Sequence, residues 1–539
     1  MILLVCLLFL INEASTTLSE DLKCAHFINF RGLLFSSHLS IMSHSSTYFA
    51  YEEPTPVTIL IYSGFILLLN AIKFVFDRLI SCGLVGQILI GVTFGVPGCK
   101  WLTLSAQKTI MQLGYIGLTL MVYEGGLSTP FKTMKDNLFL SLGVAITGII
   151  TPIGLSFTLM SFSNASPVAA FAAGAALCST SLGTALTVLS TANLKITKLG
   201  VLLTNAAVID DIAGLIMMQV VSNLGDGDFT AASVLRPVFV SLGLILVVLI
   251  FCYFALLPVT IRVIQFVSSH SGWFKSLSAE KTMFVVQTLI LIGLVIGATY
   301  GGASGLTAAY VTGAAITWWD SEILRLRNLP ISSVSSINDA SPNVEINSEI
   351  SRESTTGKWV TGHFIFNKFY AEVFNKILCP FFFGSIGFSI PITQMFTGRL
   401  IWRGFVYALL MFFSKLICGL WVLAVGYFSK RRSTESEKDM VHISSLYTAV
   451  LLGLSMVPRG EIGFLISSLA ESKGVFSDAQ SNQSSKSSEI YIVVTWAIVL
   501  CTFLGPILIG YVIRKVKKRT NELFDPLHKW GAGANISLY

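Results

Sequence analysis

The sequence predicts an all-α polytopic membrane protein with about thirteen transmembrane helices. Of its 539 residues, 53% are hydrophobic and only 12% are charged, about half the charged fraction of soluble domains. Apolar stretches of about 20 residues, the length that a helix needs to cross a bilayer, recur along the chain. Because unpaired backbone groups are costly in lipid, these stretches are expected to be helical.

Gly, Pro and charged residues separate the apolar stretches and set the order of the spans. The predicted spans are 55–76, 82–97, 106–127, 137–160, 166–189, 197–222, 232–261, 281–299, 302–319, 371–393, 400–428, 443–471 and 488–513. A polar segment rich in Ser, Asn and Glu at 321–370 is expected to be a cytoplasmic linker. The predicted domains are thus an N-terminal segment (1–54, a signal or disordered), a first membrane part (55–320), the linker (321–370), a second membrane part (371–515) and a short cytoplasmic tail (516–539).

The distribution of basic residues predicts the orientation, because cytoplasmic loops carry an excess of Lys and Arg. Residues 514–519 contain five basic residues, which places the C-terminus in the cytoplasm. Loops 161–167 and 222–233 contain none and are expected outside. Because an odd number of spans places the termini on opposite sides, the N-terminus is expected outside. The sequence does not distinguish the plasma membrane from an organelle.

Two adjacent acids, Asp210 and Asp211, lie halfway along the apolar stretch 199–221. A charge at the bilayer centre costs at least about 2.5–3.5 kcal/mol, so such residues usually have a function. Lys415 lies at a similar depth in another span, where a lone base needs a partner or loses its proton. Since neighbouring helical residues point about 100° apart, the two acids can face different surroundings.

Small, polar and Pro residues interrupt two further spans near mid-length. The fifth span contains CSTSLGT (Cys178–Thr184), and the twelfth contains MVPRGEIG (Met456–Gly463). Paired interrupted helices indicate a transporter site built from inverted repeats. The expected surroundings of the acids are therefore two broken, crossing helices whose backbone ends can hold ions.

This combination favours ion transport. A desolvated carboxylate can hold a proton, or lose it and coordinate a monovalent cation with hydroxyl and carbonyl oxygens. Competition between proton and cation for one site is the minimum requirement for antiport. Other interpretations stay open at this point: the acids and Lys415 could be a structural set, and Arg459 and Glu461 could brace the helix break. Of two further polar residues, Glu124 is expected at the interface, and Asn205 is expected to bond a neighbouring helix.

Other function classes lack sequence support. The nine cysteines form no CxxC pair or metal-ligand spacing, so neither zinc nor a disulfide framework is expected. The net charge of +7 follows from basic loops and does not indicate nucleic-acid binding. Without a nucleophile–base pair we expect no enzyme activity, and without a cofactor motif no cofactor.

At these residues the chain resembles the monovalent cation–proton antiporters, in the branch of NapA-type and Kef-type sodium/hydrogen exchangers. The matching segments are CSTSLGTALTVL, LLTNAAVIDDIAGLI, FFFGSIGFSI, FSKLICGL and PRGEIGFLI, in that order along about residues 55–515. The resemblance implies a NapA-like core domain, a dimerisation domain and a homodimer. The short tail has no room for a nucleotide-binding domain, and the linker is unlike that of compact members.

The resemblance also implies roles for single residues. Asp211 would bind the monovalent cation (Na⁺, K⁺ or Li⁺), and Asp210 would pair with Lys415. Thr180 and Ser181 would line the crossover, with Asn205, Arg459 and Glu461 in support. The DD motif with an intramembrane Lys resembles the electrogenic type, which exchanges two protons for one Na⁺.

We therefore predict a secondary active antiporter, with Na⁺ favoured over K⁺, that works by alternating access. The alternatives are a Kef-type K⁺/H⁺ exchanger, an ion channel, and a Na⁺-coupled organic solute symporter on a similar scaffold. Selectivity depends on the size and flexibility of the ion cage, which the sequence does not give.

Overall fold

The computed structural model describes residues 53–520 apart from 81, 130, 132–137, 182–197, 226–230, 257, 259, 261, 263–278, 327–359, 431–445 and 477–487. The described residues contain helices and no strand. Most of the predicted N-terminal segment, linker and tail falls outside them.

The described helices follow one another along the chain. In chain order they are α2 (Pro56–Ile80), α3 (Gly83–Phe94), α4 (Leu104–Leu127), α6 (Leu138–Ser156), α7 (Leu159–Ser163), α8 (Pro167–Cys178), α10 (Lys198–Leu224), α11 (Ala231–Phe251), η1 (Cys252–Leu256), α13 (Ala279–Tyr300), α14 (Gly305–Leu326), α16 (Gly362–Ile365), η4 (Phe366–Tyr370), α17 (Ala371–Val373), η5 (Phe374–Leu378), α18 (Cys379–Ser389), α19 (Ile392–Met395), α20 (Gly398–Leu416), η6 (Ile417–Gly419), α21 (Leu420–Lys430), α23 (Glu461–Ser472) and α24 (Glu489–Thr520).

Seven of the described helices are long and apolar enough to cross a membrane, and three shorter apolar helices accompany them. The long ones correspond to predicted spans that begin near 55, 137, 197, 232, 281, 400 and 488. The predicted membrane class is confirmed, whereas the number of thirteen spans stays a prediction.

The tenth predicted span begins earlier than expected. Its helix starts at Gly362, where Thr361 caps it by accepting a hydrogen bond from the Phe364 amide. It continues through the π-helical turns η4 and η5 to Ser389. Residues 362–370 of the predicted linker are therefore helical, although polar residues such as Asn367 and Lys368 interrupt the apolar pattern there.

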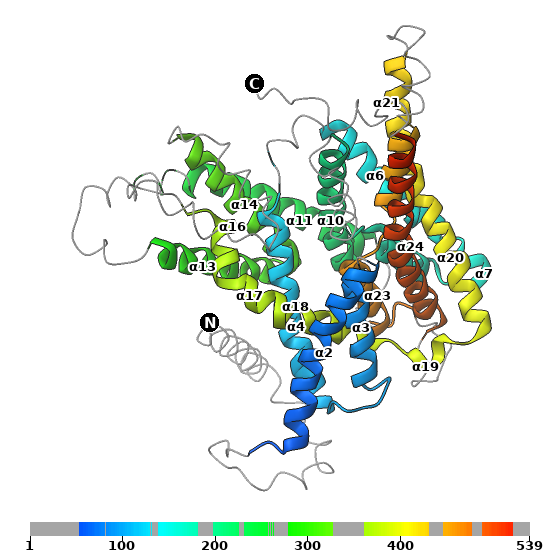
Figure 1. Ribbon diagram of the computed structural model, residues 1–539. Helices are drawn as coiled ribbons and strands as arrows, with labels where there is room; N and C mark the ends of the chain where they lie inside the picture. The colour runs from blue at the N-terminus through cyan, green and yellow to red at the C-terminus, as the bar shows by residue number, and fades with distance from the viewer. Residues whose placement is uncertain are drawn as a thin grey trace, which may run out of the picture. The chain divides into compact units, whose positions relative to one another are not determined.

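The helices pack in two groups. In the first, which we call the scaffold group, α4 packs on α14 and α18, α3 on α18, and α13 on α14. In the second, the core group, α6 packs on α8 and α10, α10 on α8 and α23, and α20 on α24. Figure 1 shows α4 (light blue) beside α14 (green), and α20 (yellow) beside α24 (red).

Glycines allow the closest approach within the scaffold group. A side chain at Gly126 of α4 would collide with the Tyr310 carbonyl of α14, and one at Gly313 with the Tyr123 carbonyl of α4. Side chains at Gly91 and Gly387 would likewise collide with backbone where α3 meets α18. Small residues at such crossings are how membrane helices gain packing energy without a hydrophobic driving force.

The core group is held by a buried apolar cluster. Its fully buried members come from several helices: Val144, Leu199, Leu202, Leu203, Ala206, Cys418, Val422, Ala449, Leu451, Leu452, Leu454, Met456 and Ile509. These residues belong to α6, α10, η6, α21, the segment 446–456 and α24. The cluster therefore holds these elements against one another.

Candidate functional site

Two interrupted helices meet in the core group. The first, α8, begins at an N-cap in which Ser166 accepts a hydrogen bond from the Ala169 amide, and it ends at Cys178. The second consists of the helix Leu446–Ser455 and α23, separated by five residues that are not helical. The Ser181 amide donates to the Pro458 carbonyl over 2.9 Å, so the two breaks lie directly against each other.

The predicted crossover residues Thr180 and Ser181 are both buried at this contact. The Thr180 hydroxyl donates to the Met456 carbonyl over 3.3 Å. A side chain at Gly460 would press against Ser181, so glycine permits the close approach. The continuation of the first interrupted helix, residues 182–189, lies outside the described residues.

Two buried cations reach the carboxyl end of α8. Lys415 Nζ donates to the Cys178 carbonyl over 2.5 Å. Arg459 Nη1 donates to the Ser179 carbonyl over 3.2 Å and lies 3.5 Å from that of Cys178. Both side chains are 0% exposed. Because the last carbonyls of a helix carry a partial negative charge, the two cations stabilise this helix end.

The Lys415 ammonium also forms an ion pair with Asp210 of α10, 3.2 Å from Oδ2, and both side chains are fully buried. The other carboxylate oxygen of Asp210, Oδ1, has no hydrogen-bond partner among the described residues. The two side chains that the sequence analysis expects to pair, Asp210 and Lys415, thus lie within ion-pair distance. Lys415 lies at the last turn of α20, directly before the 3₁₀ turn η6.

Asp211 faces different surroundings from Asp210. It is half-buried rather than fully buried. Its carboxylate lies within electrostatic range of Glu461, Asp210 and Lys415. Glu461 is also half-buried, at the first position of α23, where the helix dipole favours an acid. The two neighbouring aspartates therefore have separate environments, one closed and one partly open.

The remaining polar residues singled out in the sequence differ in burial and in their partners. Asn205 is fully buried, about one and a half turns before Asp210 on α10. Arg459 is held from its backbone as well, since the Thr502 hydroxyl of α24 donates to its carbonyl over 2.8 Å. Its Nε and Nη2 atoms have no partner among the described residues. Glu124 is half-buried in the last turn of α4, in the scaffold group.

Sequence reasoning missed the backbone of Cys178. Its carbonyl is the point at which Lys415 and Arg459 converge. A signal was present, because Cys178 is the last residue before the polar break and a helix end there leaves carbonyls without partners.

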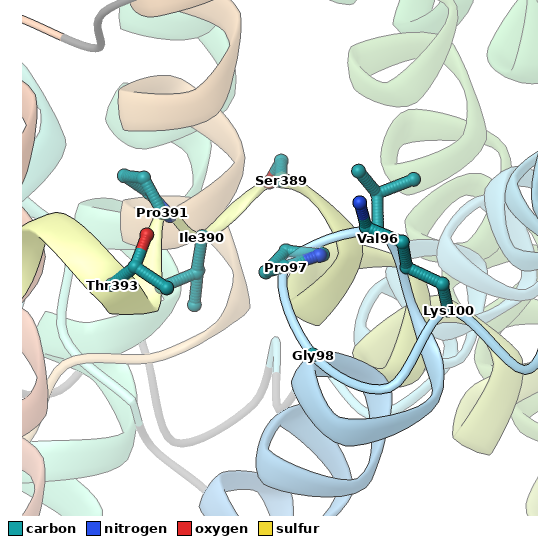
Figure 2. A pocket seen from close by; sticks show the side chains of 8 residues that line it. All are labelled: Val96, Pro97, Gly98, Lys100, Ser389, Ile390, Pro391 and Thr393. Atoms are coloured by element: carbon teal, nitrogen blue, oxygen red, sulfur yellow. The ribbon is translucent and has the colours of Figure 1, made fainter.

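A hollow elsewhere on the molecule has no acid. It lies between the loop after α3 and the loop that joins α18 to α19 (Figure 2). Its lining residues are Val96, Pro97, Gly98, Lys100, Ser389, Ile390, Pro391 and Thr393. With one cationic side chain and two hydroxyls, it differs in chemistry from the acidic site of the core group.

Comparison with known proteins agrees with this geometry. The model of the transmembrane sodium/hydrogen exchanger family matches residues 64–333 and 347–515. The chain belongs to this family. It is a multi-pass membrane protein of a transporter family, and the resemblance seen in its motifs is confirmed at the level of the cation–proton antiporter superfamily.

Curated relatives of the exchanger include several antiporters. The Na⁺/H⁺ antiporter of Enterococcus hirae is 21% identical over 433 residues, which cover 80% of this chain and 92% of the relative. The Na⁺/H⁺-K⁺ antiporter GerN of Bacillus cereus is 21% identical over 80% of this chain and 90% of the relative. The high-affinity Na⁺/H⁺ antiporter NhaS3 of Synechocystis is 32% identical, over 26% of this chain and 31% of the relative.

A solved structure shares the fold of the exchanger. The sodium proton antiporter MjNhaP1 from Methanocaldococcus jannaschii aligns with a TM-score of 0.53 at 13% identity, over 85% of this chain and 98% of that one. This likeness supports the predicted polytopic helical fold.

Proposed function

We propose that this exchanger moves a monovalent cation across the membrane in exchange for protons, with Na⁺ favoured and Asp211 as the ion-binding residue. The observation that carries the proposal is the contrast between two adjacent aspartates: Asp210 is paired with Lys415, and Asp211 is partly open. Asp210 is neutralised by Lys415 in a closed environment, while Asp211 is partly open and has another acid, Glu461, near it.

Exchange follows from competition at Asp211. A carboxylate close to a second acid, in surroundings of low dielectric constant, gains from binding either a proton or a cation. Both cannot occupy the same oxygens, so arrival of one releases the other. Thr180 and Ser181 lie at the adjacent crossing with buried hydroxyls and carbonyls. They are of the ligand type that hard cations such as Na⁺ accept.

Electrogenic exchange would use Lys415 as a second proton carrier. If the bound cation draws Asp210 away from Lys415, the ammonium keeps only the Cys178 carbonyl as a partner. A buried ammonium without a carboxylate favours release of its proton. Loss of one proton from Asp211 and one from Lys415 per Na⁺ moves a net charge in each cycle.

Alternating access would come from movement of the core group relative to the scaffold group. Extensive packing lies inside each group, while α10 and α18 supply sparser contacts between them. The family resemblance implies a homodimer, which the scaffold group would form.

The N-terminus would lie outside and the C-terminus in the cytoplasm, in keeping with the basic end of α24.

The test is proton flux in proteoliposomes, followed with a pH dye after pulses of Na⁺, K⁺ or Li⁺. Wild-type protein should move protons on addition of cation, and Asp211→Asn should not. Glu280→Gln, which alters an exposed scaffold carboxyl paired with Lys368, is the matched control and should behave as wild type. The order of ions separates Na⁺ from Kef-type K⁺ exchange.

Two results would point to other functions. A steady cation current without obligatory proton movement would indicate a channel. Cation-driven uptake of an organic solute without a pH change would indicate a symporter. Absence of proton movement with any cation, from protein shown to be folded, would contradict the antiporter proposal.

A further inference from the structure

One face of α6 contacts the segment of α20 and η6 that carries Lys415. Three residues within one helical turn form this contact, and we call them the α6 face: Thr147, Gly148 and Thr151. The Thr151 hydroxyl donates to the Ser414 carbonyl over 3.1 Å, and the Thr147 hydroxyl lies 3.8 Å from Cys418 Sγ. The chain directly before Lys415 and shortly after it is therefore tied to the same turn of α6.

Gly148 leaves the space that the Lys415 ammonium occupies. A side-chain carbon at this buried glycine would lie 3.2 Å from Lys415 Nζ and 3.4 Å from Cys418 Sγ. The first distance is shorter than an ordinary van der Waals contact, so the ammonium would have to move away from α6. The absence of a side chain at position 148 thus determines how closely Nζ approaches this helix.

Thr151 restrains the backbone next to Lys415. Its hydroxyl oxygen lies 2.6 Å from the Thr147 carbonyl of its own helix and 3.1 Å from the Ser414 carbonyl of α20. Carbonyl oxygens only accept, so the hydroxyl is the donor in both contacts. Directly after this point α20 changes to the 3₁₀ turn η6, whose hydrogen-bond geometry is poorer than that of an α-helix. A bond from outside therefore steadies the chain where it carries Lys415.

The position of the ammonium determines how strongly it pairs with Asp210. Nζ lies 2.5 Å from the Cys178 carbonyl and 3.2 Å from Asp210 Oδ2. The shorter contact is to the backbone of α8, and the longer one is to a side chain. An ammonium displaced from the α6 face therefore loses the contact with Asp210 first. Because the attraction between two charges falls with their distance, the ion pair weakens.

We propose that Gly148 and Thr151 are positioning residues that set the strength of the Lys415–Asp210 pair and, through it, the affinity for the transported cation. In the proposed exchange, a cation bound at Asp211 draws Asp210 away from Lys415. A strong pair opposes this step, and a weak pair permits it. Loosening the α6 face should thus lower stability without cation and raise the affinity for Na⁺. This inference rests on the proposed function, because it assigns the exchanged ion to Asp211.

The first test measures the pair without any cation. Gly148→Ala is compared with Gly154→Ala, which alters the same helix at a glycine with open space around it. Each variant is also combined with Asp210→Asn, and thermal unfolding midpoints are recorded in detergent. Asp210→Asn should lower the midpoint less in the Gly148→Ala protein than in wild type, because the pair is already weakened there. In the Gly154→Ala protein it should cause the full loss.

The second test measures cation affinity as the Na⁺ concentration that half-maximally stabilises the purified protein at one fixed alkaline pH. Gly148→Ala and Thr151→Val should each lower this concentration about three- to tenfold, the equivalent of one lost hydrogen bond. Thr151→Ser keeps the donor and should restore the wild-type value. Thr109→Val, which removes an exposed hydroxyl bonded only within α4, is the control and should change nothing. A defect of packing alone would lower stability without raising affinity.

The outcomes separate this inference from the proposed function. A full loss from Asp210→Asn in the Gly148→Ala protein, with unchanged Na⁺ affinity in Thr151→Val, would overturn the role of the α6 face alone. If Gly148→Ala does not fold, Thr151→Val combined with Asp210→Asn takes its place. If wild-type protein neither exchanges protons nor is stabilised by Na⁺, the proposed function fails, and with it the link to affinity. The cation-free comparison then still decides whether the α6 face positions Lys415.

Discussion

Lys415 Nζ lies 3.2 Å from Asp210 Oδ2, and neither side chain has any exposed surface. The pair differs in kind from the ion pairs at the ends of the helices. Arg399 and Glu489, for example, lie 2.7 Å apart but are 64% and 44% exposed. A buried pair is strongly coupled because removal of one partner leaves an uncompensated charge inside the protein.

We expect single substitutions in the buried pair to destabilise the protein more than the double one. Asp210→Asn or Lys415→Met should each cost about 3–5 kcal/mol, since each leaves one charge buried alone. The double variant Asp210→Asn/Lys415→Met should recover a large part of that loss. The measurement is the thermal unfolding midpoint in detergent without added cation. Glu372→Gln, which removes the exposed partner of Lys376, is the control and should change little. Additive losses in the double variant would contradict a direct coupling.

The apparent affinity for Na⁺ should depend on pH in one direction. Protons and Na⁺ compete for Asp211, so lowering the pH protonates the carboxyl and weakens cation binding. Below the pKa of the site, the half-saturating Na⁺ concentration should rise by at least about tenfold for each pH unit by which the pH falls, because linkage gives a factor of ten for each proton released when Na⁺ binds. Proton flux in proteoliposomes at a series of pH values measures this. A half-saturating concentration that stays constant over the whole range would argue against a shared site.

Lys415 should decide whether exchange carries a net charge. Lys415→Gln keeps a donor for the Cys178 carbonyl but has no proton to release. If Lys415 is the second proton carrier, this variant should retain Na⁺-driven proton flux and lose the transport current recorded on a supported membrane. Asp211→Asn should lose both flux and current. A current of wild-type size in a folded, active Lys415→Gln variant would mean that the second proton is carried elsewhere.

The glycine crossing of α4 and α14 should tolerate no side chain. Gly313→Ala places a methyl group against the Tyr123 carbonyl and the Leu127 amide, so the helices must separate. We expect a loss of at least about 1–3 kcal/mol, typical of overpacking. Gly297→Ala, on α13 with open space around it, should be neutral or slightly stabilising because alanine favours the helix. Equal thermal midpoints for both variants would show that the crossing can relax.

The membrane class and the main helices were predictable because they follow from local composition. An apolar run of sufficient length must be a helix in lipid, whatever surrounds it. That is why the helices at 56–80, 198–224 and 489–520 lie close to their predicted spans. The helical start at Gly362 was not predicted, because polar residues such as Asn367 and Lys368 interrupt the apolar pattern before the tenth predicted span. Most of the linker and of the tail lies outside the described residues, so their predicted roles stay predictions.

Asp210, Asp211 and Lys415 were identifiable from the sequence alone, since charges in apolar spans are costly wherever the helices go. Which of the two aspartates pairs with Lys415 was not evident from their positions. Adjacent positions on a helix differ by about 100°. Only the tertiary arrangement brings Lys415 of α20 to Asp210 and packs α23 on α10, while Asp211 stays partly open. Thr180 and Ser181 were likewise visible as a break in a helix, but their contact with Met456 and Pro458 joins residues far apart in the chain.

By itself, the sequence determined that this protein is a polytopic helical membrane protein with acids and a base at membrane depth, because hydropathy and charge act locally. The tertiary structure decided which groups meet: Lys415 and Arg459 at the end of α8, and Lys415 with Asp210. Those relations depend on helix crossings permitted by glycines and fixed by packing, and no local pattern encodes them.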